Sequence, residues 1–265
     1  MSLHFEKYHG IGNDFLVVDV DDPAQISIEH ARRLCDRHFG VGADGVLLVS
    51  PAQTPGARAR MSVINSDGST PEMCGNGLRC VALHLARRSR EPRAEFLVDT
   101  GAGPLLCNVV DEPAGALIGT QIGKGTPLGE VVTDVAGEPA RFFRLSTGNP
   151  HAICFRAPIS SEELDRVGPK LSSQISGGVN VEIATLTSAT EIAVTVWERG
   201  VGRTLACGTG AAATAIEAVR QGKCPPQTAL TVNLPGGPLE ITVSEDLSAY
   251  LRGPAEHVYS GTTEL

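Results

Sequence analysis

The sequence predicts an α+β protein of two pseudo-symmetric domains, each a curled, mostly antiparallel sheet wrapped around one central helix. Three observations lead to this prediction: short strand-like runs dominate the chain, one strongly apolar helix is expected in each half, and sequence landmarks recur at a nearly constant spacing. A length of 265 residues suits two ordinary domains. A hydrophobic content of 42% with 20% charged residues is typical of a globular protein with a sizeable core.

A cysteine begins each of the two expected central helices, in the segments Cys74–Gly77 and Cys207–Gly210. The apolar residues that follow have helical spacing: Leu78, Val81, Ala82 and Leu85 in the first helix, and Ala212, Ala215, Ile216 and Val219 in the second. The positive end of a helix dipole favours a thiolate over a thiol, and the N–H groups of the first turn can bind a carboxylate. Two such sites indicate two thiols facing one anionic substrate. A further, surface helix is expected near Glu29–Arg37.

Between these landmarks the chain is rich in short, β-branched runs bounded by Gly, Pro or Asp, which are typical of strands. The runs are Phe15–Asp19, Gly45–Val49, Glu95–Asp99, Leu105–Val109, Ala140–Leu145, Glu191–Trp197, Ala229–Val232 and Pro238–Val243.

An internal repeat indicates a duplication. Asn149 follows Asn13 by 136 residues, Cys207 follows Cys74 by 133, and Gly237 follows Gly103 by 134. Three matches in the same order at nearly one offset predict two domain-sized copies. We expect an N-terminal half of residues 1–115 plus 254–265 and a C-terminal half of residues 116–253. A two-fold relation between them would place the active site in the cleft between the halves.

Composition excludes several classes of partner. The net charge of −8, the absence of a Lys/Arg run and the 4% aromatic content argue against nucleic acid. No secretory leader and no run of roughly 18 apolar residues is present, which predicts no membrane association and a cytoplasmic location. Seven cysteines without framework or zinc spacing indicate reduced thiols and no metal. Five of them are expected to be small buried hydrophobes: Cys35, Cys80, Cys107, Cys154 and Cys224.

Other motifs have ordinary structural explanations. The segment Gly40–Gly45 has the letters of a dinucleotide fingerprint but leads into a strand instead of a helix, which argues against nucleotide binding. Asparagines in glycine turns commonly serve the backbone, and an adjacent pair such as Glu198 and Arg199 is commonly a surface ion pair. A single histidine such as His151 is more often structural than catalytic. Their joint placement around two helix-starting cysteines is what favours a functional site.

These segments resemble those of the diaminopimelate epimerase family. The similar segments are His9–Phe15, Cys74–Cys80, Gly148–His151, Glu198–Gly200, Ala206–Gly210 and Glu256–Gly261. The resemblance extends from Lys7 to Gly261, and the two-cysteine framework is shared with the wider proline racemase superfamily.

The resemblance implies a cofactor-independent isomerase that interconverts LL- and meso-diaminopimelate, in the biosynthesis of lysine and cell-wall precursors. It implies that Cys74 and Cys207 are the two catalytic bases, supported by His151 and Glu198. The implied substrate-binding positions are Asn13, Asn65, Gly75, Asn76, Asn149, Asn180, Glu198, Arg199, Gly208 and Thr209. It also implies a homodimer in which Tyr259 contributes to the dimer contact.

The chain departs from the family pattern in two places. Gly45 stands where some members have a substrate-contacting Gln, so that contact cannot be carried over. Gly202–Thr204 reads Gly-Arg-Thr where many members have Gly-Glu-Thr, and Arg203 would stabilise the Cys207 thiolate if it pointed toward it.

The residues alone leave other functions open. A racemase for another amino acid, such as histidine, proline or hydroxyproline, would need the same two thiols. The related isomerase fold that lacks the cysteine pair is disfavoured by the presence of both cysteines. A non-catalytic amino-acid-binding module would lack exchange of the α-proton with solvent. Arg199 and the asparagines favour a substrate with a polar distal end.

Overall fold

The structure, a computed structural model, describes residues 2–264; residues 1 and 265, which the domain prediction included, lie outside this range. The chain divides into two compact units, Met1–Thr120 with Gly253–Leu265 and Gln121–Arg252. These divisions lie five residues and one residue from the expected ones. They fall inside two continuous strands, β7 (Gly115–Lys124) and β16 (Ser248–Glu264), which belong to both units and give no turn signal at the division.

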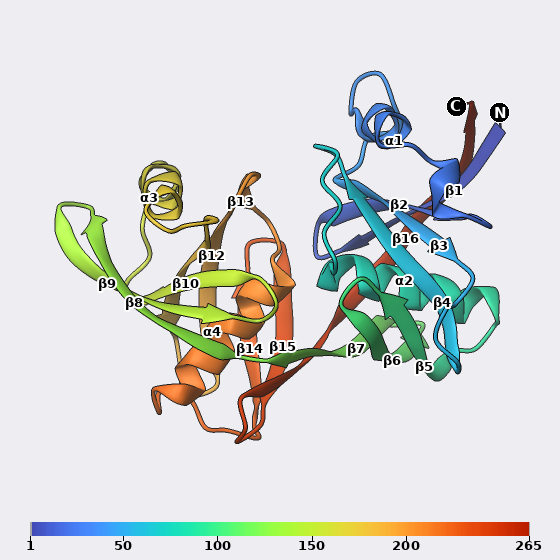
Figure 1. Ribbon diagram of the computed structural model, residues 1–265. Helices are drawn as coiled ribbons and strands as arrows, with labels where there is room; N and C mark the ends of the chain where they lie inside the picture. The colour runs from blue at the N-terminus through green and yellow to red at the C-terminus, as the bar shows by residue number, and fades with distance from the viewer. Residues whose placement is uncertain (1, 265) are drawn as a thin grey trace. The chain divides into compact units, whose positions relative to one another are not determined.

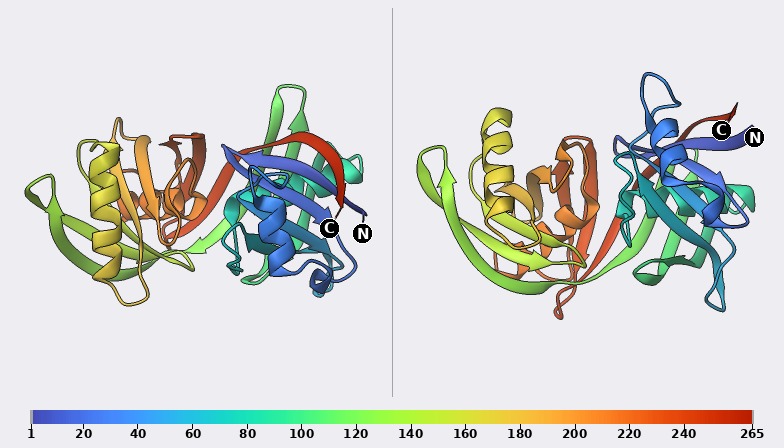
Figure 2. Two further views of the ribbon diagram at one scale, coloured as in Figure 1. Left: turned by 90° about the horizontal axis from the view of Figure 1, so that it is seen from above. Right: turned by 45° about the horizontal axis from the view of Figure 1, so that its top comes forward.

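Unit 1 is a closed sheet around a helix (Figure 1). Its other strands are β1 (Ser2–Gly10), β2 (Asn13–Asp19), β3 (Gly45–Ser50), β4 (Ala57–Asn65), β5 (Arg93–Thr100) and β6 (Gly103–Glu112). The order is β1-β2-β3-β4-β5-β6-β7-β16, and β16 pairs with β1 to complete the circuit. The first and last strands of the chain therefore run side by side (Figure 2).

Helix α2 (Gly75–Arg88) fills the inside of this sheet and is buried on all sides from Gly75 to Ala86. The outer face of the sheet is covered by a short 3-10 turn, η1 (Pro23–Gln25), and by α1 (Ile28–Cys35), which is the predicted surface helix. Strand β3 lies between the two apolar cores, so all six of its residues are buried. This explains its unbroken apolar sequence, and the segment Gly40–Gly45 leads into it as predicted.

Unit 2 also wraps its sheet around a central helix, α4 (Gly208–Arg220). Its strands are β8 (Thr126–Val135), β9 (Glu138–Ser146), β10 (Pro150–Phe155), β11 (Asn180–Leu186), β12 (Glu191–Glu198), β13 (Gly202–Thr204), β14 (Ala229–Leu234) and β15 (Gly237–Val243). They follow the order β15-β14-β12-β11-β10-β9-β8, with β13 on β12. Helix α3 (Ser161–Ser173) packs on the outer face over a separate apolar core.

The predicted duplication is confirmed strand for strand. In unit 1, β2 and β3 are parallel, as are β4 and β5; in unit 2 the parallel pairs are β10 with β11 and β12 with β14. The remaining pairings in both units are antiparallel. An outer helix follows the first strand of each first pair, and a central helix precedes the second strand of each second pair. The two-copy α+β prediction is therefore correct.

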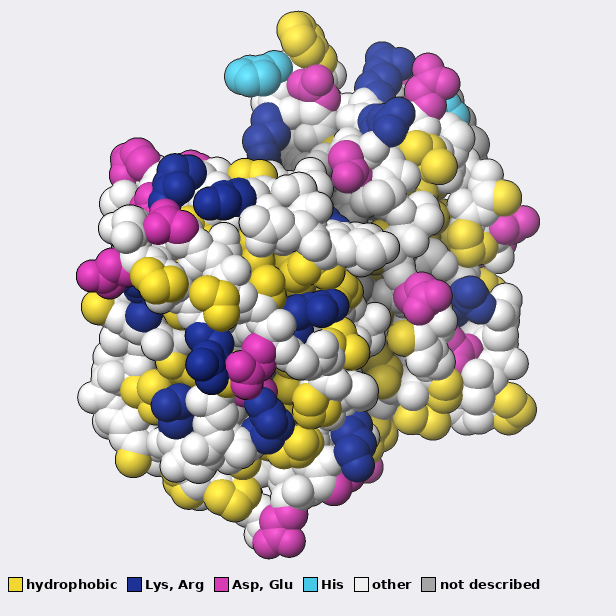
Figure 3. Space-filling view, turned by 60° about the vertical axis from the view of Figure 1, so that its left-hand side comes forward, with side chains coloured by type: hydrophobic (Ala, Val, Ile, Leu, Met, Phe, Trp, Pro, Cys, Tyr) yellow, Lys and Arg dark blue, Asp and Glu magenta, His cyan; other side chains and the backbone are white. Residues whose placement is uncertain are grey.

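The distribution of surface charge and the burial of the cysteines agree with what the amino-acid composition predicts. Lys/Arg and Asp/Glu side chains are interspersed over the face drawn in Figure 3. None of the helices within residues 2–264 is long and apolar enough to cross a membrane. The five cysteines expected to be buried hydrophobes, Cys35, Cys80, Cys107, Cys154 and Cys224, are all buried and free, which confirms that interpretation.

A Gly168→Ala substitution in α3 is expected to destabilise the protein by about 1–3 kcal/mol. A Cβ at this position would lie 2.3 Å from Cγ of Trp197, and the partly buried indole packs against the apolar core under α3. This overlap outweighs the roughly 1 kcal/mol that alanine gains over glycine in a helix interior. Urea unfolding measures the effect, with Lys170→Ala on the exposed side of α3 as the control. Equal or higher stability of Gly168→Ala would contradict the packing.

Candidate active site

Cys74 is the N-cap of α2. Its backbone is extended, with φ −136° and ψ 110°, and its Sγ accepts a hydrogen bond from the Gly77 N–H at 3.4 Å. A Cβ on Gly77 would lie 2.8 Å from Cδ2 of Leu47, so glycine lets this turn pack closely on β3. The partly buried thiol therefore sits where a helix start gathers backbone N–H donors.

Two predicted substrate-binding residues of unit 1 are hydrogen-bonded to each other. Asn76 Nδ2 donates to Asn13 Oδ1 at 3.0 Å, and Asn13 Nδ2 donates to Asp44 Oδ2 at 2.7 Å. Asp44 in turn accepts a hydrogen bond from the Arg37 guanidinium at 2.7 Å. Because each amide has one donor and one acceptor end, this chain fixes the orientation of both asparagines.

Asn65 is held separately, at the end of β4. Its Nδ2 donates to Ser69 Oγ at 2.9 Å, and its backbone pairs with Gly45 on β3. A side chain at position 45 would begin 3.0 Å from the Ile64 carbonyl oxygen. The backbone next to Asn65 therefore carries no side chain at position 45.

Cys207 is the N-cap of α4 in nearly the same geometry as Cys74. Its φ is −128° and its ψ is 101°, and its Sγ accepts the Gly210 N–H at 3.4 Å. The sulfur also lies 3.5 Å from Oγ1 of Thr209. The thiol is buried, with 5% of the residue exposed. The duplication therefore produces the same N-cap cysteine in both units.

A chain of polar side chains leads from Cys207 into the interior of unit 2. Asn149 Nδ2 donates to Thr209 Oγ1 at 3.2 Å, and Asn149 Oδ1 lies 3.0 Å from His151 Nε2. His151 Nδ1 lies 2.6 Å from Oε1 of Glu182, and both of these side chains are fully buried. The predicted residues Asn149, His151 and Thr209 are thus brought together with the cysteine.

His151 joins the cysteine side of this chain to the buried acid. One ring nitrogen contacts the side-chain oxygen of Asn149 and the other contacts Glu182. Within residues 2–264, the second carboxylate oxygen of Glu182 is buried without a hydrogen-bond partner. The contacts with His151 and Asn149 therefore fix the orientation of the Glu182 carboxylate next to Cys207.

The other predicted residues of unit 2 lie at the end of β12. Glu198 accepts a hydrogen bond from the Thr204 hydroxyl and interacts with the Cys207 thiol. The Arg199 N–H donates to Asn180 Oδ1 at 2.9 Å, and its guanidinium donates to the Gly177 carbonyl.

The electrostatics at Cys207 correct one expectation. Burial raises the pKa of the Cys207 thiol well above its usual value, and the carboxylates of Glu198 and Glu182 raise it further. Hydrogen bonds from Thr209 and the Gly210 N–H act in the opposite direction but do not compensate. Burial also raises the pKa of Glu198. At Cys207 burial, together with these two acids, therefore opposes the thiolate that a helix N-terminus favours.

Two further residues singled out in the sequence, Arg203 and Tyr259, make contacts with residues other than the two cysteines. The Arg203 guanidinium binds Asp165 on α3 at 2.8 Å in an exposed ion pair, which gives it a carboxylate partner of its own. Tyr259 on β16 is 43% exposed and packs edge-on against Phe5, with ring centroids 6.0 Å apart.

Two charged residues of the central elements, Glu182 and Arg79, are fully buried and were not predicted from the sequence. Glu182 lies in the apolar strand Asn180–Leu186, where an isolated acid signals a buried partner. Arg79 on α2 is also fully buried. Its one signal in the sequence is that it lies between the apolar residues Leu78 and Cys80. Consecutive residues of a helix point in different directions, so apolar neighbours on both sides indicate a helix that is buried all round.

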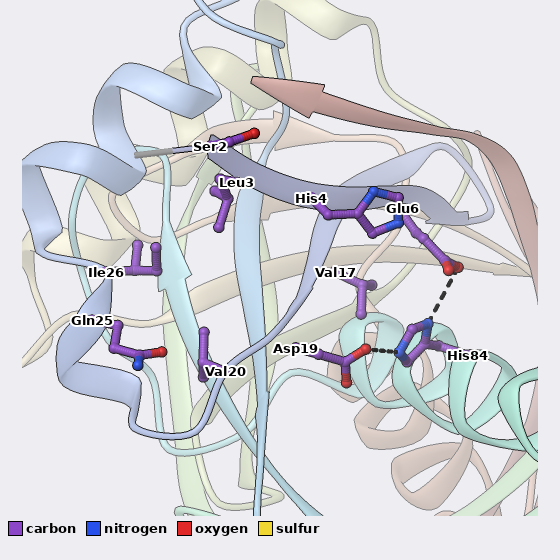
Figure 4. A pocket seen from close by; sticks show the side chains of 10 residues that line it. All are labelled: Ser2, Leu3, His4, Glu6, Val17, Asp19, Val20, Gln25, Ile26 and His84. Atoms are coloured by element: carbon purple, nitrogen blue, oxygen red, sulfur yellow. Dashed lines mark hydrogen bonds and ion pairs between the residues drawn. The ribbon is translucent and has the colours of Figure 1, made fainter. Parts of the chain in front are cut away.

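A pocket in unit 1 is lined by none of the predicted site residues (Figure 4). Its walls come from β1, β2, the η1 region and α2. At one side His84 Nδ1 lies 3.2 Å from Glu6 and Nε2 lies 3.1 Å from Asp19 (Figure 4). Both ring nitrogens of His84 are thus engaged by carboxylates, and the pocket contains no cysteine.

A raised thiol pKa means that the Cys207 thiolate forms only as the pH rises into the alkaline range. Iodoacetamide is therefore expected to alkylate Cys207 slowly at neutral pH and progressively faster above it. Glu198→Gln removes one of the charges that oppose ionisation and is expected to lower the midpoint by roughly one pH unit. Peptide mass spectrometry measures the rate, and Glu191→Gln on the same strand is the control. An unchanged midpoint in Glu198→Gln would rule out this coupling.

The chain is similar to known proteins over most of its length. The family model described as diaminopimelate epimerase matches residues 5–125 and 143–258. A diaminopimelate epimerase of Synechocystis sp. is 40% identical over 285 residues, covering 100% of both chains. The chloroplastic diaminopimelate epimerase of Oryza sativa is also 40% identical, covering 98% of this chain and 80% of its own.

Solved structures share the fold at low sequence identity. A hydroxyproline epimerase from Agrobacterium vitis is 14% identical, with a TM-score of 0.77 over 99% of this chain and 91% of its own. A phenazine biosynthesis protein of the PhzF family from Bacillus anthracis is 15% identical, with a TM-score of 0.75 over 100% of both chains. With the family match and full-length relatives at 40% identity, this chain belongs to the diaminopimelate epimerase family.

Proposed function

We propose that this isomerase interconverts LL- and meso-diaminopimelate with Cys74 and Cys207 as its two bases. One observation carries the proposal: both duplicated units present a cysteine as the N-cap of a central helix, with each sulfur 3.4 Å from the N–H three residues later. Inversion needs one group to remove the α-proton and another to deliver a proton to the opposite face. A single base would return the proton to the face it left.

The two helix starts also suit the charge that develops during proton removal. As the α-proton leaves, negative charge moves onto the substrate carboxylate, which becomes enolate-like. Backbone N–H groups at Gly75–Asn76 and Gly208–Thr209 are suited to bind it, because such preorganised donors can each contribute roughly 3–4 kcal/mol. By stabilising this negative charge, the backbone N–H groups of the protein help the carbanion to form.

The residues at the end of β12 suit the distal end of diaminopimelate. Arg199 can hold the distal carboxylate with its forked guanidinium, and Glu198 with Asn180 can accept hydrogen bonds from the distal ammonium. Asn13 and Asn149 provide further amide contacts. A racemase for proline or another small amino acid would have no use for this arrangement.

The proposal is tested with an epimerisation assay on LL- and meso-diaminopimelate and on the common amino acids, each in deuterated solvent. We expect inversion with uptake of solvent deuterium at one centre of diaminopimelate only. Faster inversion of another amino acid would replace the substrate assignment. Binding without deuterium uptake would indicate a non-catalytic module.

Arg199→Lys is expected to raise KM and lower kcat, reducing kcat/KM by roughly 10- to 100-fold. Lysine keeps the charge but loses the bidentate fork, and weaker binding of the remote end positions the α-carbon less well. Steady-state kinetics with LL-diaminopimelate measure this, and Arg203→Lys, whose guanidinium pairs with Asp165, is the control. Equal kinetics for Arg199→Lys and the wild type would place Arg199 outside the substrate site.

We also propose a cytoplasmic homodimer that uses the β16 surface around Tyr259. The exposed side chains of Val258 and Tyr259 supply apolar area there, at 52% and 43% exposure. Sedimentation velocity of Tyr259→Asp against the wild type tests this contact.

A further inference from the structure

The backbone of Asp44 connects two strand ends of unit 1. Its N–H donates to the Asp14 carbonyl at 2.9 Å, and its own carbonyl accepts a hydrogen bond from the Ser66 N–H at 2.9 Å. These two partners directly follow Asn13 and Asn65, which are proposed substrate-binding residues. Asp44 therefore ties the start of β2 to the end of β4, at the places where the two asparagines lie.

The side chain of Asp44 holds Asn13 in one orientation. Its Oδ2 accepts hydrogen bonds from Asn13 Nδ2 at 2.7 Å and from the Asp14 N–H at 3.1 Å, and its Oδ1 accepts one from Arg37 at 2.7 Å. A carboxylate that pairs with an arginine has no hydrogen to donate, so the amide nitrogen of Asn13 must face it. The Asn13 oxygen accepts a hydrogen bond from Asn76 at 3.0 Å. An amide nitrogen carries two hydrogens, so one is left for a ligand.

The segment Gly40–Gly45 carries Asp44 on a loop that is bonded to α1. Its first four N–H groups donate to backbone carbonyls at the C-terminal end of α1, at 2.9–3.1 Å. A Cβ on Gly40 would lie 2.1 Å from the Arg33 carbonyl oxygen, so glycine lets the loop pass directly against the helix. The buried Lys7 on β1 donates to a carbonyl of the same loop. The segment with the letters of a dinucleotide fingerprint thus serves as a fixed support for one carboxylate.

Arg37 links the same carboxylate to a second one. Its guanidinium donates to both carboxylate oxygens of Asp14, at 2.6 and 3.2 Å, as well as to Asp44. The Arg37 side chain is 55% exposed and that of Asp44 is 41% exposed. Ion pairs with this exposure contribute little to the stability of a fold. The geometry that the ion pairs impose on Asn13 therefore explains the arrangement better than fold stability does.

We propose that Asp44 is a positioning residue that presents the remaining N–H of the Asn13 amide to the substrate. This inference rests on the proposed role of Asn13 in substrate binding. Because the amide is already oriented in the free enzyme, binding does not have to order it. Loss of Asp44 therefore weakens substrate binding through Asn13.

The test is a double-mutant cycle on kcat/KM for LL-diaminopimelate. Asn13→Ala and Asp44→Ala are each expected to lower kcat/KM by roughly ten-fold, mainly through KM. Because both changes act on the same amide, the double variant is expected to lose about as much as Asn13→Ala alone. A loss in the double variant equal to the product of the single losses overturns the inference. Unchanged kcat/KM in Asn13→Ala also overturns it, because Asn13 would then lie outside the substrate site.

Asp36→Ala is the matched control. The Asp36 carboxylate supports the same connection between α1 and β3 by accepting the N–H groups of His38 and Phe39, both at 2.8 Å. Its loss is expected to leave kcat/KM unchanged. Asp44→Asn keeps an acceptor oxygen and is expected to retain most of the wild-type kcat/KM. Equal losses in Asp36→Ala and Asp44→Ala overturn the proposal, because loosening of the loop would explain both.

Hydrogen exchange of the Asn13 side-chain amide, followed by NMR in the free protein, tests the orientation without turnover. The signal is assigned by its loss in Asn13→Ala. Exchange is expected to be several-fold slower in the wild type than in Asp44→Ala, and equal rates overturn the inference. If Asp44→Ala does not fold, wild-type exchange as fast as that of an exposed asparagine overturns it. A wild-type protein that does not invert diaminopimelate would instead refute the proposed function, and this exchange measurement would still decide the role of Asp44.

Discussion

Replacing either Cys74 or Cys207 with alanine is expected to reduce epimerisation by about a thousand-fold or more while leaving the fold intact. Each substitution removes one of the two proposed bases, and no other thiol is an N-cap in the helices of residues 2–264. Loss of a small sulfur atom at a helix start costs little packing. Circular dichroism and thermal unfolding check the fold, and a coupled assay with LL-diaminopimelate checks the rate.

Single-cysteine variants permit a sharper test. A variant with one remaining base can still remove the α-proton of one isomer and return it to the same face. Cys207→Ala is therefore expected to exchange the α-proton of one diaminopimelate isomer for solvent deuterium without inverting it, and Cys74→Ala that of the other isomer. Cys80→Ala, a buried cysteine on the same helix as Cys74, should remain active. Inversion at a near-normal rate by either of the first two variants would refute the two-base assignment.

Most of the architecture could be predicted because the duplication left its signals in the sequence. The helices after Cys74 and Cys207 are short apolar patterns interrupted by few polar residues, and the surface helix has a serine cap, an acid in its first turn and two arginines in its last turn. The predicted strands correspond to β2, β3, β5, β6, β9, β12, β14 and β15. These are the runs in which apolar, β-branched residues are continuous or strictly alternate.

Three of the elements that escaped prediction, α3, β4 and β8, lack that continuity. Helix α3 has its apolar residues at helical spacing, but Gly168 and Pro169 interrupt it, and both residues normally argue against a helix interior. Strand β8 is almost entirely exposed, and β4 alternates arginines with small residues. Tertiary pairing, which a local pattern does not contain, decides these segments.

The site was partly predictable for a related reason. Helix-starting cysteines and glycine-turn asparagines are local features, so Cys74, Cys207 and Asn149 could be recognised along the chain. Glu182 and Arg79 could not, because each becomes buried only when the sheet closes around a central helix. A charged residue in such a position resembles an ordinary surface residue until its burial is known.

Gly210→Ala is expected to lower kcat by about 100-fold, because a misplacement of about 1 Å at a reacting group has effects of this size. A Cβ at position 210 would lie 2.7 Å from Glu182 Oε1 and 3.2 Å from Cys207 Sγ. The carboxylate cannot retreat freely, since it is fully buried and held by His151 at 2.6 Å. The methyl group must therefore displace the thiol, the carboxylate or both.

The duplication supplies a matched control for this prediction. Gly77 occupies the equivalent position after Cys74, but a Cβ there meets Leu47 methyl groups, at 2.8 and 3.4 Å, and no buried carboxylate. Gly77→Ala is therefore expected to affect packing and stability more than kcat, whereas Gly210→Ala should affect kcat and also move the alkylation midpoint of Cys207. Kinetics, urea unfolding and alkylation on both variants distinguish the two effects. Equal losses of kcat would mean that Glu182 contributes nothing specific, because steric crowding at a helix start would then explain both.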